Sequence, residues 1–128
     1  MRNITFRGKR LDNGEWVYGD LIENQGRYFI YHAMSETTIE DNDDGRIVVA
    51  AVEVDPATVG QYTGMKDRYG DRIWEGDLVE HGDEVSAVFF DTENSCFDFK
   101  ASNDPFAAQF FCDYEILGNI HDSPDLLK

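Results

Sequence analysis

The stretch VGQYTGMKDRYGDRIWEGDLV, residues 59–79, mixes repeated glycines with Val, Ile, Tyr and Trp. Each glycine costs about 1 kcal/mol in a helix interior, so these residue types favour short strands joined by turns. In the overlapping segment GDRIWEGDLVEHGDEVSAVF (residues 70–89), a turn precedes a strand, an EGD corner bends it, and a second strand returns after HGD. Glycine at such corners lets a small β-barrel bend sharply while closure hides the sheet edges. We therefore expect Gly70, Gly76 and Gly82 to adopt positive φ angles or to lie at close backbone approaches.

Working outward, turn signals recur between short runs rich in β-branched and aromatic residues. Asn13-Gly14 is the strongest, because both central positions of a tight hairpin turn need φ > 0. Asp55-Pro56, Asp104-Pro105 and Ser123-Pro124 indicate short capped helical turns. The sequence predicts a mainly β, small barrel-containing single domain over residues 1–128, with short helical turns. The expected strands are Ile4–Arg10, Glu15–Ile22, Gly26–His32, Arg46–Val54, Arg72–Val79, Glu84–Asp91, Cys96–Lys100 and Cys112–Ile120.

Composition indicates a folded but strongly acidic protein. A hydrophobic content of 41% in 128 residues is enough for a core, and the net charge is -15. Such a charge repels phosphate backbones and anionic lipids, so we expect neither direct nucleic-acid binding nor membrane binding. Residues 1–18 are an exception, with four basic and two acidic side chains. This basic edge on an acidic body predicts self-association into a homo-oligomer.

The two cysteines, Cys96 and Cys112, have neither disulfide-scaffold nor zinc spacing and are expected to be buried thiols in a reducing compartment. The N-terminus MRNITFRGKR lacks the apolar core of a signal peptide. No apolar run approaches the roughly 20 residues that span a bilayer. We expect a cytoplasmic protein.

Three segments together resemble the YopX-like proteins of bacteriophages and prophages. They are FRGKRLDNGEWVYGDL (residues 6–21), DPATVGQYTGMKDRYGDRIWEGDLV (55–79) and YEILGNIHDSPDLL (114–127). The resemblance implies a β-rich, barrel-containing fold and a phage or prophage accessory protein in the cytoplasm of a bacterial host. It carries fold and origin rather than an activity. Residues 23–54 and 81–113 match the family poorly, and Asp71 stands where such proteins often have Lys.

Sequence motifs give little support for catalysis. Nucleophile elbow, Walker, dinucleotide, HExxH and CxxC patterns are all missing from the chain. The histidines His32, His81 and His121 have no companion at metal-ligand spacing, and His121 is expected to cap or bond backbone near the C-terminal turn. A calcium loop starting at Glu40 fails at its twelfth position, which is Ala51 instead of a bidentate Glu. We expect no metal, no cofactor and no catalytic residue, although a site assembled from distant positions would leave no motif.

The glycine-rich centre also contains polar side chains that could hold a small ligand. Gln61, Thr63 and Lys66 offer hydrogen-bond donors, and Tyr62 offers an aromatic ring for stacking. Lys66, Arg68 and Arg72 form a basic cluster in the middle of the chain. The alternative is that Tyr62 packs on the sheet while Thr63 and Asp67 satisfy turn backbone. Trp16, Trp74 and Tyr18 are expected to be core or subunit-interface aromatics. The candidate ligand-binding residues are Gln61, Tyr62, Thr63, Lys66, Asp67 and Arg72.

Four functions therefore remain open. The leading one is a non-catalytic accessory protein that binds a host or phage protein, for example a host-defence inhibitor whose acidic surface mimics nucleic acid. The second is an oligomer that binds or sequesters a nucleotide through the central motif, by which we mean residues 61–72. The third is a structural oligomer, and a carboxylate- or metal-dependent hydrolase is a weaker fourth. The candidate acidic surface consists of Glu40, Asp41, Asp43 and Asp44.

Overall fold

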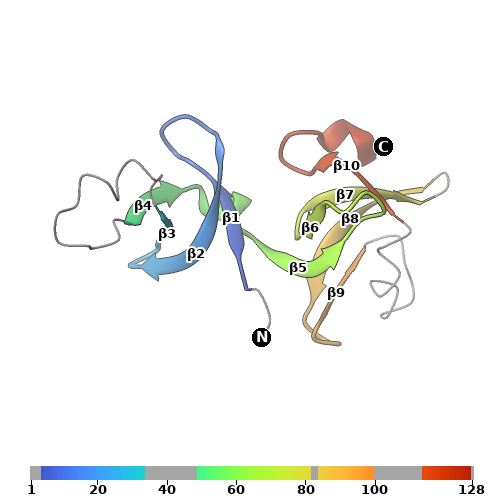
Figure 1. Cartoon of the computed structure of the whole chain (residues 1–128), viewed down its shortest axis with the longest axis horizontal. Helices are drawn as coiled ribbons and strands as arrows, with labels where there is room; N and C mark the ends of the chain where they lie inside the picture. Colours follow the sequence, from blue (N-terminus) through green and yellow to red (C-terminus); the bar gives the residue numbers. More distant parts are fainter. Residues whose placement is uncertain (1–3, 34–48, 82–83, 100–113, 128) are drawn as a thin grey trace. The chain divides into compact units, whose positions relative to one another are not determined.

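A computed structural model of the chain describes residues 4–33, 49–81, 84–99 and 114–127 (Figure 1). The described residues are mainly β and contain no α-helix, and their strand pairings are antiparallel. Their contacts divide the chain into an N-terminal unit, residues 4–60, and a C-terminal unit that begins at Gln61. The mainly β prediction is confirmed, and the prediction of one domain over residues 1–128 stays a prediction.

The N-terminal unit is an antiparallel sheet whose strands follow the order β4-β3-β2-β1. Ile30 and Val54 on its inner face are fully buried. Gly8 belongs to the same face, and a Cβ built on it would lie 3.0 Å from the Val54 side chain. A glycine there lets the first and last strands of the unit approach closely. The elements are β1 (Phe6–Lys9), β2 (Trp16–Asn24), β3 (Arg27–Ala33), β4 (Val49–Val54) and the 3-10 turn η1 (Pro56–Thr58).

This sheet curls until the end of β1 meets the end of β4. Arg10 and Val54 form an isolated antiparallel bridge. The Leu11 amide donates to the Glu53 carbonyl at 3.1 Å, and the Asp55 amide donates to the Lys9 carbonyl at 2.8 Å. These bonds join the ends of the two strands, whereas a barrel needs pairing along their length. Barrel closure is thus absent from the described strand pairings, and the expected barrel stays a prediction.

The tight turn of the N-terminal unit lies elsewhere than expected. The first hairpin forms, but its loop runs from Leu11 to Gly14, because the Arg10 amide donates to the Glu15 carbonyl at 2.9 Å. Gly14 has φ 73°, whereas Asn13 uses its side-chain oxygen to accept the Glu15 amide at 2.9 Å. The prediction of positive φ at Asn13 is wrong.

Between β2 and β3, by contrast, Gln25 and Gly26 have φ angles of 54° and 79°. They connect the paired residues Asn24 and Arg27. Two consecutive positive φ angles between paired strand ends are typical of the tight hairpin turn that matches strand twist.

The C-terminal unit combines a hairpin with a sheet ordered β10-β7-β8-β9. Ile73, Val79, Val88 and Phe99 form its buried core, and Met65, Tyr114 and Ile116 pack against this cluster. In Figure 1 the β8–β9 hairpin (orange) extends away from the rest of its sheet. The elements are β5 (Gly60–Lys66), β6 (Arg72–Trp74), β7 (Asp77–His81), β8 (Glu84–Asp91), β9 (Cys96–Phe99), β10 (Glu115–Asn119) and the 3-10 turn η3 (Pro124–Leu127).

The EGD corner transfers the chain from the β5–β6 hairpin to the four-stranded sheet. The Trp74 amide donates to the Asp77 carboxylate at 2.7 Å, and Asp77 is buried. Gly76 has φ 94°, and its amide donates to the Val88 carbonyl at 2.8 Å. The expected positive φ is confirmed for Gly76 and for Gly70 (φ 85°), while Gly82 lies outside the described residues. The corner is therefore an architectural element.

The GNIHDSP motif forms a capped turn after β10. The Asn119 side-chain oxygen accepts the amides of His121 and Asp122 at 3.0 and 2.9 Å. A Cβ at Gly118 would lie 2.6 Å from the Ser123 hydroxyl oxygen, so a larger residue there would require the Ser123 side chain to shift. The expected short helical turns at Asp55 and Ser123 are confirmed as η1 and η3, and the one at Asp104 lies outside the described residues. No helix in the described part of the chain is long and apolar enough to cross a membrane.

Candidate functional site

The six candidate ligand-binding residues lie together on one hairpin. Gln61, Tyr62, Thr63 and Lys66 belong to β5, Asp67 begins the following turn, and Arg72 begins β6. The register places Tyr62 opposite Trp74 and Lys66 opposite Arg72, with an irregularity between the two pairs. The segment expected to be a ligand loop is thus mostly the strand β5, and its role in ligand binding stays a prediction. Their contacts determine which of them are available to a ligand.

The Asp67 carboxylate is committed to backbone. It is buried at 5% exposure, and one oxygen accepts the amides of Tyr69 and Asp71, both at 2.9 Å. The other oxygen accepts the Ile116 amide on β10 at 3.2 Å. A buried carboxylate that accepts several backbone amides stabilises a turn and has little capacity left for a ligand.

Thr63 and Gln61 are also used within the hairpin. The Thr63 hydroxyl donates to the Ile73 carbonyl at 2.8 Å and accepts the Met65 amide at 3.1 Å. The Gln61 amide donates to the Glu75 carboxylate at 3.3 Å, and the Gln61 carbonyl accepts the Glu75 amide at 2.9 Å. The Thr63 bonds bridge the irregular part of the β5–β6 pairing, between Tyr62 and Lys66, whereas the Gln61 bonds involve its backbone and lie beyond the Tyr62–Trp74 pair.

Tyr62 packs into the hairpin. Its ring is 7% exposed and lies 5.4 Å from the Trp74 ring, centroid to centroid, at an interplanar angle of 45°. The Arg72 guanidinium lies 5.1 Å from the Tyr62 ring centroid, which is cation–π distance. The expectation that Trp74 is a core aromatic is confirmed, since it is 6% exposed.

Three basic side chains remain at the surface of this motif. Lys66, Arg68 and Arg72 are exposed, and Lys66 and Arg72 are directly opposite each other across the hairpin. Arg68 lies 5.9 Å from the Tyr69 ring centroid. Exposed cations around a turn can contact an anion. A hollow of about 280 Å³ elsewhere in the described residues belongs to the N-terminal unit and is lined by Arg10, Leu11, Asp12, Ala51, Val52 and Glu53.

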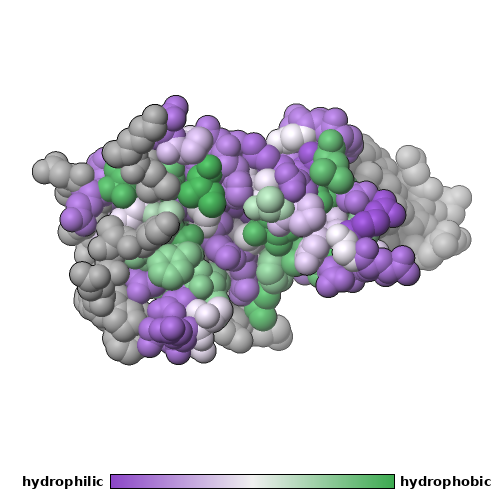
Figure 2. Space-filling view, turned by 180° about the vertical axis from the view of Figure 1, so that it is seen from behind, coloured by the Kyte–Doolittle hydropathy of each residue, from purple (hydrophilic) through white to green (hydrophobic). Residues whose placement is uncertain are grey.

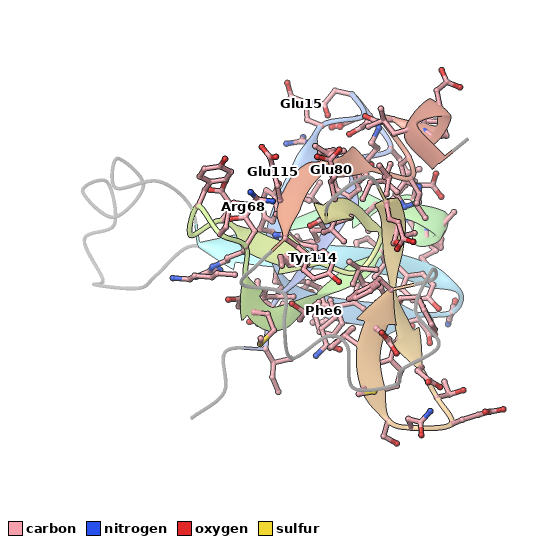
Figure 3. All side chains as sticks on the ribbon, turned by 90° about the vertical axis from the view of Figure 1, so that its right-hand side faces the viewer. Phe6, Glu15, Arg68, Glu80, Tyr114 and Glu115 are labelled. Atoms are coloured by element: carbon pink, nitrogen blue, oxygen red, sulfur yellow. The ribbon has the colours of Figure 1, made fainter. Side chains whose placement is uncertain are left out.

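A pair of like charges lies next to this motif in the C-terminal unit. Glu80 on β7 and Glu115 on β10 are directly opposite each other across the strands. Figure 3 shows both side chains side by side, with Arg68 close to Glu115. The Arg68 amide donates to the Tyr114 carbonyl at 2.9 Å, which holds the turn against the start of β10. Opposed carboxylates on neighbouring strands repel each other.

Most of the other candidate residues from the sequence lie outside the described part of the chain. Glu40, Asp41, Asp43, Asp44 and Cys112 lie outside the described residues, as do the side chains of His32 and His81. His121 is half-buried in the Asn119 turn. No group of three or more His, Cys, Asp or Glu side chains that could hold a metal occurs among the described residues.

Cys96 is half-buried, not fully buried as expected. Burial, with a smaller contribution from the charges of Asp91 and Asp98, raises the pKa of its thiol above the ordinary value. A raised pKa disfavours the reactive thiolate at neutral pH.

Sequence reasoning missed a cluster in the N-terminal unit. The Arg7 guanidinium lies 4.5 Å from the Trp16 ring centroid, and the Lys9 ammonium lies 5.5 Å from it. Arg7 and Lys9 alternate along β1 opposite Tyr18 and Trp16 on β2. Tyr18 is 48% exposed, so it is not a core aromatic within the chain. The alternation of cations and aromatic residues across the predicted first hairpin is the signal that could have revealed this cluster.

A family model described as YopX protein matches residues 5–128. The crystal structure of protein EF1440 from Enterococcus faecalis is similar over 100% of both chains, with a TM-score of 0.65 and 17% sequence identity. At this identity the similarity supports the fold alone. A search of curated proteins finds no match.

Proposed function

The chain belongs to the YopX protein family, and on that premise we propose that it is a non-catalytic phage or prophage accessory protein that binds a host or phage macromolecule. The proposal rests on one observation: the side chains of the central motif mostly contact the protein itself. Asp67 and Thr63 spend their polar atoms on backbone, and the Tyr62 ring packs on Trp74. A motif that serves the fold leaves recognition to the outer surface of the protein.

The chemistry of that surface favours a protein partner with a basic groove. The net charge of -15 presents a negative field, which attracts a surface that normally holds phosphates. We propose that Glu40, Asp41, Asp43 and Asp44 contribute to this field and that the protein inhibits a host-defence factor by competing with its nucleic acid. Only four of the 26 acidic residues need be near the groove, since the whole chain supplies the long-range field.

The test is charge reversal of those four acids in the full chain. Tagged wild-type protein is recovered from infected or lysogenic bacteria, its co-purifying protein is identified, and the affinity of the pair is measured at moderate salt. Reversal of all four acids to Lys is expected to abolish most of the binding. A matched control reverses Glu84 and Glu93, exposed acids of the β8–β9 hairpin, and is expected to leave binding nearly unchanged. Equal binding by wild type and the four-acid variant would exclude these four acids as the mimic.

The second candidate function is nucleotide sequestration by the exposed cations of the central motif. Lys66 and Arg72 are opposite each other, and Arg68 follows in the turn, so an anionic group could contact more than one of them. A neighbouring subunit would have to complete the pocket, which links this proposal to the proposed homo-oligomer. Substitution of Lys66 and Arg72 by Ala together is expected to release such a ligand. If the ligand is retained, this candidate fails.

A further inference from the structure

The loop between β1 and β2, residues 11–14, contains an asparagine followed by a glycine, Asn13 and Gly14. No other asparagine in the sequence precedes a glycine. In such a pair the backbone nitrogen of the glycine can attack the side-chain amide of the asparagine. Glycine has no Cβ beside this nitrogen, so the attack meets little steric hindrance. The loop thus places a nucleophile and an electrophile on neighbouring residues, with water as the further reactant.

The reaction converts the Asn13 amide into a carboxylate. The Gly14 nitrogen gives its proton to solvent and bonds to Cγ of Asn13, the bond from Cγ to Nδ2 breaks, and ammonia leaves. The product is a cyclic succinimide. Water opens this ring at the side-chain carbonyl to give Asp, or at the backbone carbonyl to give isoaspartate, in which the main chain runs through the side chain. One water is consumed and one ammonia is released, with no change of oxidation state.

The closed loop withholds the nucleophile. The Gly14 amide donates to the Arg10 carbonyl at 2.9 Å, and the hydrogen in this bond is the proton that the reaction must remove. The Arg10 amide in turn donates to the Glu15 carbonyl at 2.9 Å, which fixes both ends of the loop. A nitrogen whose hydrogen is directed at Arg10 cannot attack Cγ of Asn13. The loop must therefore open before the reaction begins.

The electrophile is held by the residue that follows. The Asn13 side-chain oxygen accepts the Glu15 amide at 2.9 Å, and Nδ2 lies 3.4 Å from a Glu15 carboxylate oxygen. A donor on the side-chain oxygen stabilises the negative charge that develops there during the attack. This contact favours the reaction, whereas the Gly14–Arg10 bond opposes it. Because the attack cannot start while the Gly14 nitrogen keeps its proton, the bond to Arg10 decides the outcome.

Water has access to the loop, and the loop is tied to the closure of the sheet. Asn13, Gly14 and Glu15 are exposed, and Figure 1 shows the loop (blue) extending beyond β1 and β2. In Figure 2, hydrophilic residues separate the hydrophobic groups on the face shown, as expected of a surface in contact with water. The Leu11 amide donates to the Glu53 carbonyl at 3.1 Å, so the contact with β4 helps to keep the loop closed.

We propose that Asn13 is a deamidation site that the closed β1–β2 loop protects. Asn13 keeps its amide while Gly14 is bonded to Arg10, and it is converted to Asp or isoaspartate when the loop opens. Isoaspartate adds a methylene to the main chain, so the loop can no longer make the Gly14–Arg10 and Arg10–Glu15 bonds together. Opening of the loop then becomes irreversible through chemical modification. This inference goes beyond the proposed function, because it requires no partner.

The test compares the folded full chain with a synthetic peptide of residues 8–20 in the same mildly alkaline buffer. Trypsin releases residues 11–27 from the chain, and mass spectrometry with fragmentation locates the modified residue and separates Asp from isoaspartate. The hydrogen bonds of Gly14 and Asn13 must break together, so the rate at Asn13 is expected to be roughly tenfold lower in the folded chain. In the peptide, Gly14→Ala is the matched control and is expected to slow the reaction severalfold, because its Cβ shields the nitrogen.

The products give a second measurement. Asp at position 13 keeps an acceptor for the Glu15 amide, so Asn13→Asp is expected to melt close to the wild type. The isoaspartate form, purified from aged protein, is expected to melt a few degrees lower. Equal rates in the chain and the peptide, or a faster rate in the chain, would overturn the protection by the loop. An unmodified Asn13 in the peptide would overturn the site itself, and an isoaspartate form as stable as the wild type would overturn the irreversible opening.

Discussion

The Asp67 carboxylate accepts the backbone amide of Ile116 at 3.2 Å, although the two residues are 49 positions apart in the chain. The contact links the turn of the central motif to the C-terminal strand β10. The Arg68 amide adds a second link by donating to the Tyr114 carbonyl at 2.9 Å. A polar residue that looks like a ligand contact in the sequence thus connects distant segments in the fold.

Removal of this carboxylate is expected to destabilise the protein. Asp67→Ala leaves the amides of Tyr69, Asp71 and Ile116 without their acceptor, and we expect a loss of about 3 kcal/mol in the free energy of unfolding. Urea denaturation measures it. Asp71→Ala is the matched control, because its exposed side chain is expected to contribute less than about 0.5 kcal/mol. Equal stability of the two variants would show that Asp67 is not a structural residue.

A close approach in the N-terminal unit gives a second prediction. A Cβ at Gly19 would lie 2.1 Å from the Tyr31 carbonyl oxygen, so Gly19→Ala must displace β3 from β2. We expect it to cost about 3 kcal/mol, at the upper end for overpacking. Gly26→Ala meets nothing within 4 Å and has only its positive φ of 79° to oppose it, so about 1 kcal/mol is expected. Thermal unfolding of both variants checks the order, and a reversed order would contradict the described β2–β3 register.

The opposed carboxylates of Glu80 and Glu115 predict a stabilising substitution. Glu80→Gln removes the repulsion and leaves Glu115 beside Arg68, so the free energy of unfolding is expected to rise by about 0.5 kcal/mol at low salt. The gain should shrink at high salt, since salt screens exposed charges. Glu93→Gln, in the exposed β8–β9 turn, serves as the control for the general reduction in negative charge. An equal gain in both variants would mean that the pair itself contributes nothing.

The Cys96 thiol gives a prediction about pH. Burial, followed by the charges of Asp91 and Asp98, raises its pKa, so the thiolate forms only at higher pH than in an ordinary thiol. In a Cys112→Ser background, the rate of alkylation by iodoacetamide should have its midpoint above that of the urea-unfolded chain. Asp91→Asn is expected to lower this midpoint, because one of the negative charges is removed. A midpoint equal to that of the unfolded chain would contradict the half-buried position of Cys96.

Local signals in the sequence predicted most of the architecture. Runs of β-branched and aromatic residues between turn signals located most of the strands, but β5 (Gly60–Lys66) was not predicted, and the expected strand Arg72–Val79 is divided into β6 and β7. The EGD corner and the Asp55 cap were located from residue types alone, since each depends on contacts within a few positions. The turn at Asn13 was wrong because the closure of β1 on β4 requires a longer loop there. The short spacing of the candidate residues in the sequence indicated that they lie close together. It could not indicate which of their polar atoms are available to a ligand. An aspartate at position 67 is compatible with either a ligand contact or a structural bond. Only the fold shows that it accepts the Ile116 amide, which is 49 positions away in the chain.

The most direct measurement is the native mass spectrum of the protein purified gently from infected or lysogenic bacteria. The account predicts that the wild type and the Lys66→Ala, Arg72→Ala double variant both retain the same macromolecular partner, because the central motif serves the fold. A small molecule retained by each wild-type subunit and lost from the double variant would contradict the account. Such a result would assign ligand binding to the exposed cations of the central motif.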